Sequence, residues 1–255
     1  MPAAGGQGSS WLAGDIVLKP LDMSVPELTW LAELPGLIRC DGFRVSHPVR
    51  AENNEVVVDG WCAWHRVDGR HEDRRWPDII AVGERFHAAL AGIPRPEFID
   101  DRSHQWAVAD RVAWGELPAD RLEHVKHLSR LLASLRPVDA PRQLVHSDLT
   151  GNVLFAEGLP PAIIDLSLFW RPPAYASAIV VADALVWEGA GEDLLESMAH
   201  IEDWEQFFLR ALIFRAVTDE LFRGQPPGRR EDDDPYGPAV EIAYRCFLKK
   251  STIAS

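Results

Sequence analysis

Three polar side chains, Asp148, Asn152 and Asp165, stand at the ends of short apolar runs within one stretch of the sequence. A carboxylate can accept the proton of a hydroxyl group, and an amide and a second carboxylate offer the oxygen ligands that Mg²⁺ prefers. This set suits Mg²⁺-assisted phosphoryl transfer, with Asp148 as the base and Asn152 and Asp165 as metal ligands. The ordered set is more specific than a single His-x-Asp pair, so the segment predicts a kinase.

A β-hairpin is expected to hold the two metal ligands. Residues 152–155 and 162–164 are apolar strand candidates, and residues 157–161, with one glycine and two prolines, supply the turn. Asn152 then begins one strand and Asp165 ends the other. Both side chains can therefore face one metal ion.

A second group of residues, near the N-terminus, predicts a phosphate anchor. Gly5, Gly6 and Gly8 let backbone N–H groups approach phosphate oxygens, since no Cβ obstructs them. Lys19 ends a strand candidate over residues 15–19, and in kinases a strand lysine after a glycine-rich loop pairs with the α- and β-phosphates. A flexible tail and a solvated edge lysine are the alternative interpretations.

Glu27 is the expected partner of Lys19. It opens a helix predicted over residues 26–34, and a Lys–Glu pair would hold the ammonium toward the phosphates. Glu33 on the same helix competes, and Glu27 is preferred because it lies nearer to Lys19 in the sequence. The alternative for Glu27 is a first-turn acid favoured by the helix dipole.

The segment 61–66 is predicted to be a strand that connects two parts of the protein. Such a connector can offer backbone N–H and C=O groups to a nucleotide base, so Trp64, His65 and Arg66 are candidate nucleotide contacts. Trp64 could also wall the pocket, as apolar side chains do for many ligands. An ordinary core position is the alternative for Trp64.

The elements change character along the chain, from strands to helices. We therefore expect an α+β fold with a small β-rich N-lobe at residues 1–66, which binds nucleotide, and a larger helical C-lobe at residues 67–255, which holds the catalytic loop and the metal site. The strand candidates are residues 15–19, 43–49, 55–58 and 61–65, the helix candidates of the C-lobe are 78–90, 119–135 and 201–222, and 224–238 is expected to be a loop.

Composition narrows the functional class. Hydrophobic residues make up 47% of the 255 residues and charged residues 25%, which is usual for a globular protein. A formal charge of −13 argues against nonspecific nucleic-acid binding, which needs a basic surface. No apolar stretch approaches the ~20 residues that span a bilayer, and no secretory signal is visible. The three cysteines are few and far apart, so we expect a cytoplasmic protein with reduced thiols.

The motifs that carry this chemistry resemble those of known families. The segments His146-Ser-Asp-Leu-Thr-Gly-Asn152 and Ile163-Ile-Asp165 resemble the aminoglycoside phosphotransferase and choline kinase-type families. More narrowly, Gly5-Gly-Gln-Gly8 and residues 164–173 are similar to an actinobacterial subgroup. The resemblance implies a protein-kinase-like fold, ATP or GTP as donor, Mg²⁺ as cofactor and a hydroxylated small-molecule acceptor. It also implies the roles given above to Asp148, Asn152, Asp165, Lys19 and Glu27.

The sequence departs from that pattern in three places, and two of them, the Asp148–Asn152 spacing and the missing first strand, favour an alternative function. The family places five steps between the catalytic aspartate and the asparagine, whereas Asp148 and Asn152 are four apart. Leu166-Ser167 stands where the family has Phe-Gly or Trp-Glu. Only four residues precede Gly5, so we expect the first strand of the N-lobe to be missing. The alternative is a degenerate kinase-like protein with weak or no nucleotide binding, acting as a binding or regulatory module.

We also predict roles for two further residues near these motifs, His146 and Arg171. His146 is expected to brace the catalytic loop by hydrogen bonds rather than act as a base. Arg171 could border the acceptor pocket and steady a phosphate, because arginine binds such groups through two donors. The alternative for Arg171 is a proline-stiffened turn that packs on the helical lobe. A protein kinase is disfavoured, since no activation-loop segment follows Asp165, and the sequence indicates neither the acceptor nor an oligomeric state.

Overall fold

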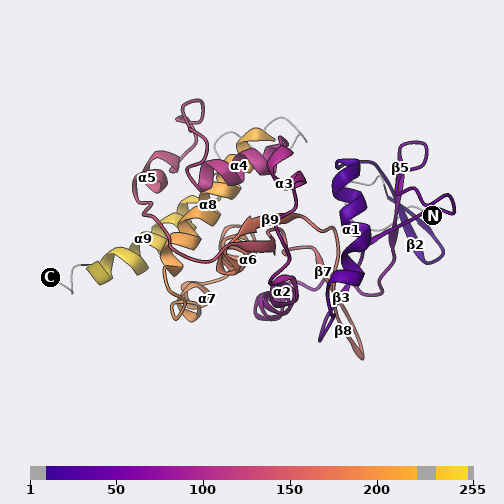
Figure 1. Ribbon diagram of the computed structural model, residues 1–255. Coiled ribbons are helices and arrows are strands. Elements are labelled where there is room, and N and C mark those ends of the chain that lie inside the picture. The colour runs from indigo at the N-terminus through magenta and orange to yellow at the C-terminus, as the bar shows by residue number, and fades with distance from the viewer. Residues whose placement is uncertain (1–9, 223–233, 252–255) are drawn as a thin grey trace. The chain divides into compact units, whose positions relative to one another are not determined.

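The computed structural model describes residues 10–222 and 234–251 and has the predicted mixed α+β fold (Figure 1). Its chain divides into two compact units that alternate along the sequence. The first contains residues 1–72, 77–101 and 143–170, and the second contains residues 73–76, 102–142 and 171–255. The lobe boundary expected after residue 66 stays a prediction.

An antiparallel sheet forms the start of the first unit. Strands β1 (Trp11–Ala13), β2 (Ile16–Pro20), β5 (Trp61–His65) and β4 (Pro48–Val49) lie in the order β1-β2-β5-β4. In the pairing of β2 with β5, Lys19 is opposite Cys62 and Val17 is opposite Trp64. Directly opposed residues, and residues two apart, point to the same side of a sheet, so these four side chains share one face.

Helix α1 (Val25–Leu37) begins as its sequence predicts. Ser24 caps it by accepting a hydrogen bond from the backbone N–H of Glu27, and Pro26 occupies the first turn. The helix continues past Pro35, where we expected it to end. Only its last residues lie beyond the proline, so a single backbone hydrogen bond near the helix end is lost.

The predicted hairpin is present in a second small sheet. Strands β3 (Arg44–Val45), β8 (Leu159–Ile163) and β7 (Val153–Ala156) lie in the order β3-β8-β7, with Val153 opposite Ile163. The turn is shorter than expected, because β8 already begins at Leu159. Its two prolines lie in the part of β8 that β3 does not pair, where no hydrogen bond to β3 is lost.

A two-stranded sheet and two helices complete the surroundings of the catalytic segment. Strand β6 (Gln143–His146) precedes the hairpin in the sequence, and strand β9 (Leu168–Arg171) follows it. These two strands pair with each other in a two-stranded sheet. Helix α2 (Trp76–Leu90) buries an apolar face that includes Ile79, Val82 and Phe86. The short helix α3 (Phe98–Asp101) follows it.

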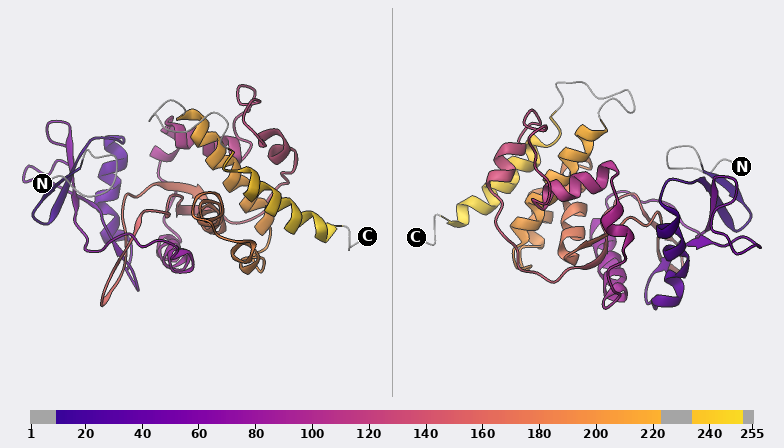
Figure 2. Two further views of the ribbon diagram at one scale, coloured as in Figure 1. Left: turned by 180° about the vertical axis from the view of Figure 1, so that it is seen from behind. Right: turned by 45° about the horizontal axis from the view of Figure 1, so that its top comes forward.

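The second unit is a helical assembly built around α8 (Trp204–Leu221). This helix packs against α4 (Gln105–Ala113), α5 (Leu128–Ala133), α6 (Pro173–Trp187) and α9 (Gly237–Ser251), while α7 (Glu192–Ser197) contacts α6 (Figure 2). Residues of α6 and α8 are buried on nearly all sides, which is typical of central helices in a globular protein.

Two segments differ from the sequence prediction for identifiable reasons. The helix expected over residues 119–135 is limited to α5, because turns replace its first half and His127 adopts a left-handed conformation, φ +66°, from which it pairs with Asp234. The strand expected over residues 55–58 is absent. Asp59 and Gly60 have φ of +50° and +80°, and the tight turn they form leaves only a bridge between Val58 and Trp61.

The remaining predictions have mixed outcomes. The strand expected over residues 43–49 is split between β3 and β4, which belong to different sheets. Most of the loop expected over 224–238 lies outside the described residues, and α9 begins within it at Gly237. None of the helices in the described ranges is long and apolar enough to cross a membrane, and none of the three cysteines forms a disulfide within those ranges.

Candidate active site

A tight loop brings the Asn152 amide onto Asp148. The Asn152 Nδ2 donates to the Asp148 backbone carbonyl at 2.7 Å and to the Asp148 Oδ2 at 3.2 Å. Gly151 has φ +80°, a conformation that glycine adopts without strain, and the Asn152 N–H donates to the Leu149 carbonyl within the same turn. The four-residue spacing therefore still joins the two predicted residues.

Asp165 lies at the same end of the β7–β8 hairpin as Asn152. The Ile164 N–H donates to the Asn152 carbonyl at 3.0 Å, which continues the hairpin register by one pair. Asp165 then adopts φ +52°, a left-handed conformation that aspartate tolerates better than most residues, and the chain turns out of β8. Its side chain is 52% exposed.

Lys19 contacts Asp165 directly. The ammonium lies 2.6 Å from the Asp165 Oδ1 and 5.3 Å from the centroid of the Trp64 ring, on the face of the sheet that Trp64 shares. Lys19 thus forms an ion pair with Asp165, and Glu27 lies on the buried side of α1. A Lys19–Glu27 pair stays a prediction.

Asp22 is an acidic neighbour that the sequence did not reveal. Partial burial raises the pKa of its carboxyl group, the Lys19 ammonium lowers it, and the Asp165 carboxylate raises it further. The folding of the chain after β2 therefore brings a second carboxylate near the Lys19–Asp165 pair. Asp22 lies three residues beyond the end of the strand candidate 15–19, where no periodicity or motif could have singled it out.

His146 braces the loop as predicted. Its Nδ1 accepts a hydrogen bond from the Asp148 backbone N–H at 3.2 Å, so the proton of the neutral ring resides on Nε2, which donates to the Ile164 carbonyl at 3.2 Å. The ring is fully buried, and burial lowers its pKa. One imidazole therefore ties the backbone of Asp148 to the residue before Asp165.

His87, on α2, was missed by the sequence analysis. Its Nε2 accepts the backbone N–H of His146 at 3.0 Å, and only 2% of the residue is exposed. The available signal was a histidine within the apolar face of the predicted helix 78–90. Burial lowers its pKa to about 3, and the nearby His146 adds to the shift.

This shift predicts a pH-dependent stability. Because the folded-state pKa of His87 lies below its ordinary value of 6.5, the free energy of unfolding should fall as pH drops from 6.5 toward 3, by at most ~1.4 kcal/mol per pH unit. Urea denaturation between about pH 7 and about pH 5 would measure the slope. His87→Gln should make the slope shallower; an unchanged slope would show that His87 is not the group responsible.

The connector residues use their backbone groups within the sheet. The His65 N–H donates to the His47 carbonyl at 2.8 Å, the His65 carbonyl accepts the Ser46 hydroxyl at 2.7 Å, and the Arg66 N–H donates to Asp15. Val67 is the first residue after β5 whose backbone forms no hydrogen bond with the described residues. Gly5, Gly6 and Gly8 lie outside the described residues, so their phosphate contact stays a prediction.

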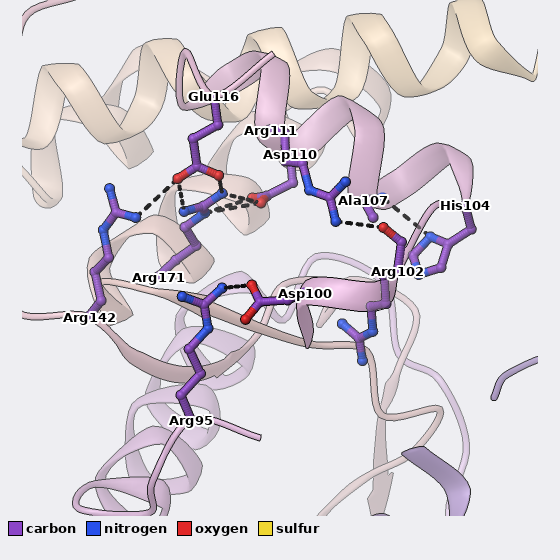
Figure 3. Close-up of polar contacts among 10 residues, drawn as sticks. All are labelled: Arg95, Asp100, Arg102, His104, Ala107, Asp110, Arg111, Glu116, Arg142 and Arg171. Carbon is purple, nitrogen blue, oxygen red and sulfur yellow. Dashed lines mark hydrogen bonds and ion pairs between the residues drawn. The ribbon is translucent and has the colours of Figure 1, made fainter. Parts of the chain in front are cut away.

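Arg171, in the second unit, has a structural role (Figure 3). Its Nε and one terminal nitrogen donate to Asp110 at 3.0 and 2.6 Å, and both terminal nitrogens donate to Glu116 at 2.7 Å. Only 5% of Arg171 is exposed, and Arg142 reaches the same Glu116 carboxylate. The expectation that Arg171 steadies a phosphate is wrong, because two carboxylates already engage its guanidinium.

Comparison with known proteins identifies the fold. No family model and no curated protein matches the sequence. Among solved structures, a thermostable mutant of aminoglycoside phosphotransferase APH(4)-Ia has a TM-score of 0.56 at 15% identity, covering 97% of this chain and 94% of its own. The chain has the fold of the aminoglycoside phosphotransferases. Spectinomycin phosphotransferase APH(9)-Ia gives a TM-score of 0.56 at 15% identity, covering 98% of this chain and 88% of its own.

A relative from the second predicted family shares the phosphotransferase fold. The choline/ethanolamine kinase family protein from Mesorhizobium loti has a TM-score of 0.50 at 17% identity, covering 97% of this chain and 86% of its own. The structural similarity establishes the fold that was predicted from the sequence. The narrower similarity to an actinobacterial subgroup stays a prediction.

The donor atoms of the site suit a magnesium ion. Within residues 10–222 and 234–251, no group of three or more His, Cys, Asp or Glu side chains could hold a metal by itself. Mg²⁺, however, commonly uses one or two protein oxygens together with phosphate oxygens. The Asn152 Nδ2 is fixed on Asp148, which leaves the amide oxygen directed away from it, and Asp165 offers a half-exposed carboxylate. These two residues fit the predicted role.

Proposed function

We propose that the protein is a phosphotransferase that moves the γ-phosphoryl group of ATP, or of GTP, to a hydroxyl group of a small molecule. The observation that carries this proposal is the geometry of one compact unit. There, Asn152 binds Asp148, and Lys19 binds Asp165 at the end of the same hairpin. A base, an amide oxygen, a carboxylate and an ammonium are the groups that phosphoryl transfer requires.

Asp148 would accept the proton of the attacking hydroxyl group. The Asn152 amide donates to one carboxylate oxygen of Asp148 and so fixes its orientation, while the other oxygen can point to the acceptor. The hydrogen bond from the Asp148 N–H to His146 fixes the backbone of the base as well. The acceptor hydroxyl would therefore meet a preoriented carboxylate.

Asn152 and Asp165 would hold Mg²⁺, which, when bound, neutralises charge on the phosphates. Lys19 would exchange its contact with Asp165 for the phosphate oxygens of the donor. Trp64, on the same face of the sheet, would wall the base pocket, and the free backbone groups of Val67 would bind the edge of the base. These assignments use only groups that the first unit itself supplies.

The solved structures support a nucleotide as the phosphoryl donor, and they do not identify the acceptor of this chain. Spectinomycin phosphotransferase APH(9)-Ia was solved with ADP and spectinomycin, and a thermostable mutant of APH(4)-Ia was solved with ADP and hygromycin B. A nucleotide donor and a hydroxylated acceptor fit this chain by analogy of fold. An aminoglycoside-like compound or another small metabolite is the acceptor class that we propose.

The alternative, a degenerate kinase-like protein that acts as a binding or regulatory module, is favoured by one observation. The Lys19 ammonium occupies a carboxylate oxygen of Asp165 at 2.6 Å, which a metal ion would need. In a degenerate kinase this pair would be permanent. In an enzyme a magnesium–nucleotide complex would displace it.

A thermal-shift titration should separate the two functions. Mg²⁺-ATP at about 100 times its Kd should stabilise the folded protein by ~2.7 kcal/mol, because a ligand that binds only the native state raises the melting temperature. The shift should vanish in Asp165→Ala and persist in Asp100→Ala, whose carboxylate pairs with the exposed Arg95. Absence of any shift in the unmodified protein would support the binding or regulatory module.

A further inference from the structure

We infer that His87 is a positioning residue, which sets the conformation of the catalytic loop (residues 147–152) through the backbone of His146. The inference deepens the proposed function and rests on it for its catalytic consequence. Its geometric part concerns α2, β6 and the loop, which all belong to the first unit.

The hydrogen bond between His87 and His146 fixes the state of both rings. A backbone N–H can only donate, so the His87 Nε2 that receives it at 3.0 Å carries no proton. His87 is therefore neutral, with its proton on Nδ1. The His146 N–H is in turn held by an acceptor that an apolar side chain could not replace.

His146 contacts both parts of the proposed site, the catalytic loop with Asp148 and the segment that leads to Asp165. The backbone of His146 is held by His87, and its ring receives the Asp148 N–H at 3.2 Å and donates to the Ile164 carbonyl at 3.2 Å. Any displacement of the His146 backbone would therefore move the ring that orients the base and the residue before Asp165.

Two other contacts place α2 against the same segment. A Cβ on Gly83, one helical turn before His87, would lie 2.5 Å from the Leu149 Cδ1, so the helix backbone directly contacts the residue after Asp148. At the other side of His87, its carbonyl accepts the Gln143 Nε2 at 2.6 Å. Helix α2 thus meets β6 and the catalytic loop at three successive points.

The buried Nδ1 of His87 argues that packing alone does not explain this residue. It has no hydrogen-bond partner within the described part of the chain. An unsatisfied buried donor destabilises a fold, and an apolar side chain of similar size would avoid it. What a histidine supplies here, and an apolar residue does not, is the acceptor for the His146 N–H.

Three variants test the inference through the basal hydrolysis of Mg²⁺-ATP, with ADP as the measured product. His87→Leu should lower kcat by roughly 10- to 100-fold, because a small misplacement of a catalytic group has effects of that size, with the KM for ATP unchanged. His87→Gln should restore most of the rate, since its Oε1 can replace Nε2 as acceptor. His104→Leu is the matched control, because His104 also accepts a backbone N–H, that of Ala107, at 3.2 Å in the second unit.

Amide NMR spectra supply a readout that does not depend on activity. His87→Leu should shift the backbone amide signals of Asp148 and Asn152, whereas His87→Gln and His104→Leu should leave them in place. If His87→Leu keeps both the amide signals and kcat, the inference is overturned. If the unmodified protein hydrolyses no ATP but the amide signals shift as expected, His87 still positions the loop and only the proposed function is lost.

Discussion

Replacing Asp148 with asparagine should lower kcat for phosphoryl transfer by roughly 10²- to 10⁴-fold, the usual effect of removing a general base. The amide of the new side chain keeps the size and hydrogen bonds of the loop but cannot accept the hydroxyl proton. The melting temperature and the stabilisation by Mg²⁺-ATP should both be retained. Phosphorylated products formed from a metabolite extract, detected by mass spectrometry, would measure the activity.

Asp41→Asn is the matched control for this experiment. Asp41 is an exposed aspartate of the same unit, outside the proposed site, and its replacement should leave the rate unchanged. Full activity in Asp148→Asn would show that another group accepts the proton. Loss of both activity and thermal stability would show instead that Asp148 is needed for folding.

Replacing Arg171 with methionine should reduce the free energy of unfolding by ~3–5 kcal/mol, because it leaves the buried carboxylate of Asp110 without its cation. Of the two carboxylates that Arg171 binds, the Asp110 side chain is 6% exposed and the Glu116 side chain 39%, so water can solvate only the second. Urea denaturation monitored by circular dichroism would measure the loss.

A second pair of variants isolates the cause of the Arg171 effect. Arg95→Met removes an exposed ion pair with Asp100 and should change the free energy of unfolding by no more than ~1 kcal/mol. Arg171→Met combined with Asp110→Leu should recover much of the stability, because no uncompensated charge remains. If the double variant is as unstable as the sum of the single ones, charge burial does not explain the loss.

The local parts of the site were predictable because their signals are local. The hairpin that carries Asn152 and ends before Asp165 follows from two short apolar runs around a glycine–proline turn. The position of Lys19 on a strand follows in the same way, since β2 is a compact apolar run. A helix start at Pro26 was predicted because proline is favoured in the first turn, and α1 begins one residue earlier, at Val25.

The contacts between distant segments were not predictable. Lys19 and Asp165 are 146 residues apart, and nothing in either segment indicates that they form a pair. The same holds for Arg171, whose two carboxylate partners lie on and just after α4, which the sequence analysis did not single out. In the helix expected over residues 119–135, the first half forms turns, and His127 at the start of α5 contacts Asp234, which is 107 residues away in the sequence and could not be predicted as its partner.

Under the proposed function, the contact between Lys19 and Asp165 would also affect how tightly a nucleotide binds. A partly exposed ion pair of this kind contributes about 1 kcal/mol or less, so opening it weakens binding by a factor of about five at most. The contact also holds the Lys19 ammonium beside Asp165, so that the side chain does not extend into solvent. Under the proposed function, the Lys19 ammonium would occupy the Asp165 carboxylate until a magnesium–nucleotide complex displaced it at little cost.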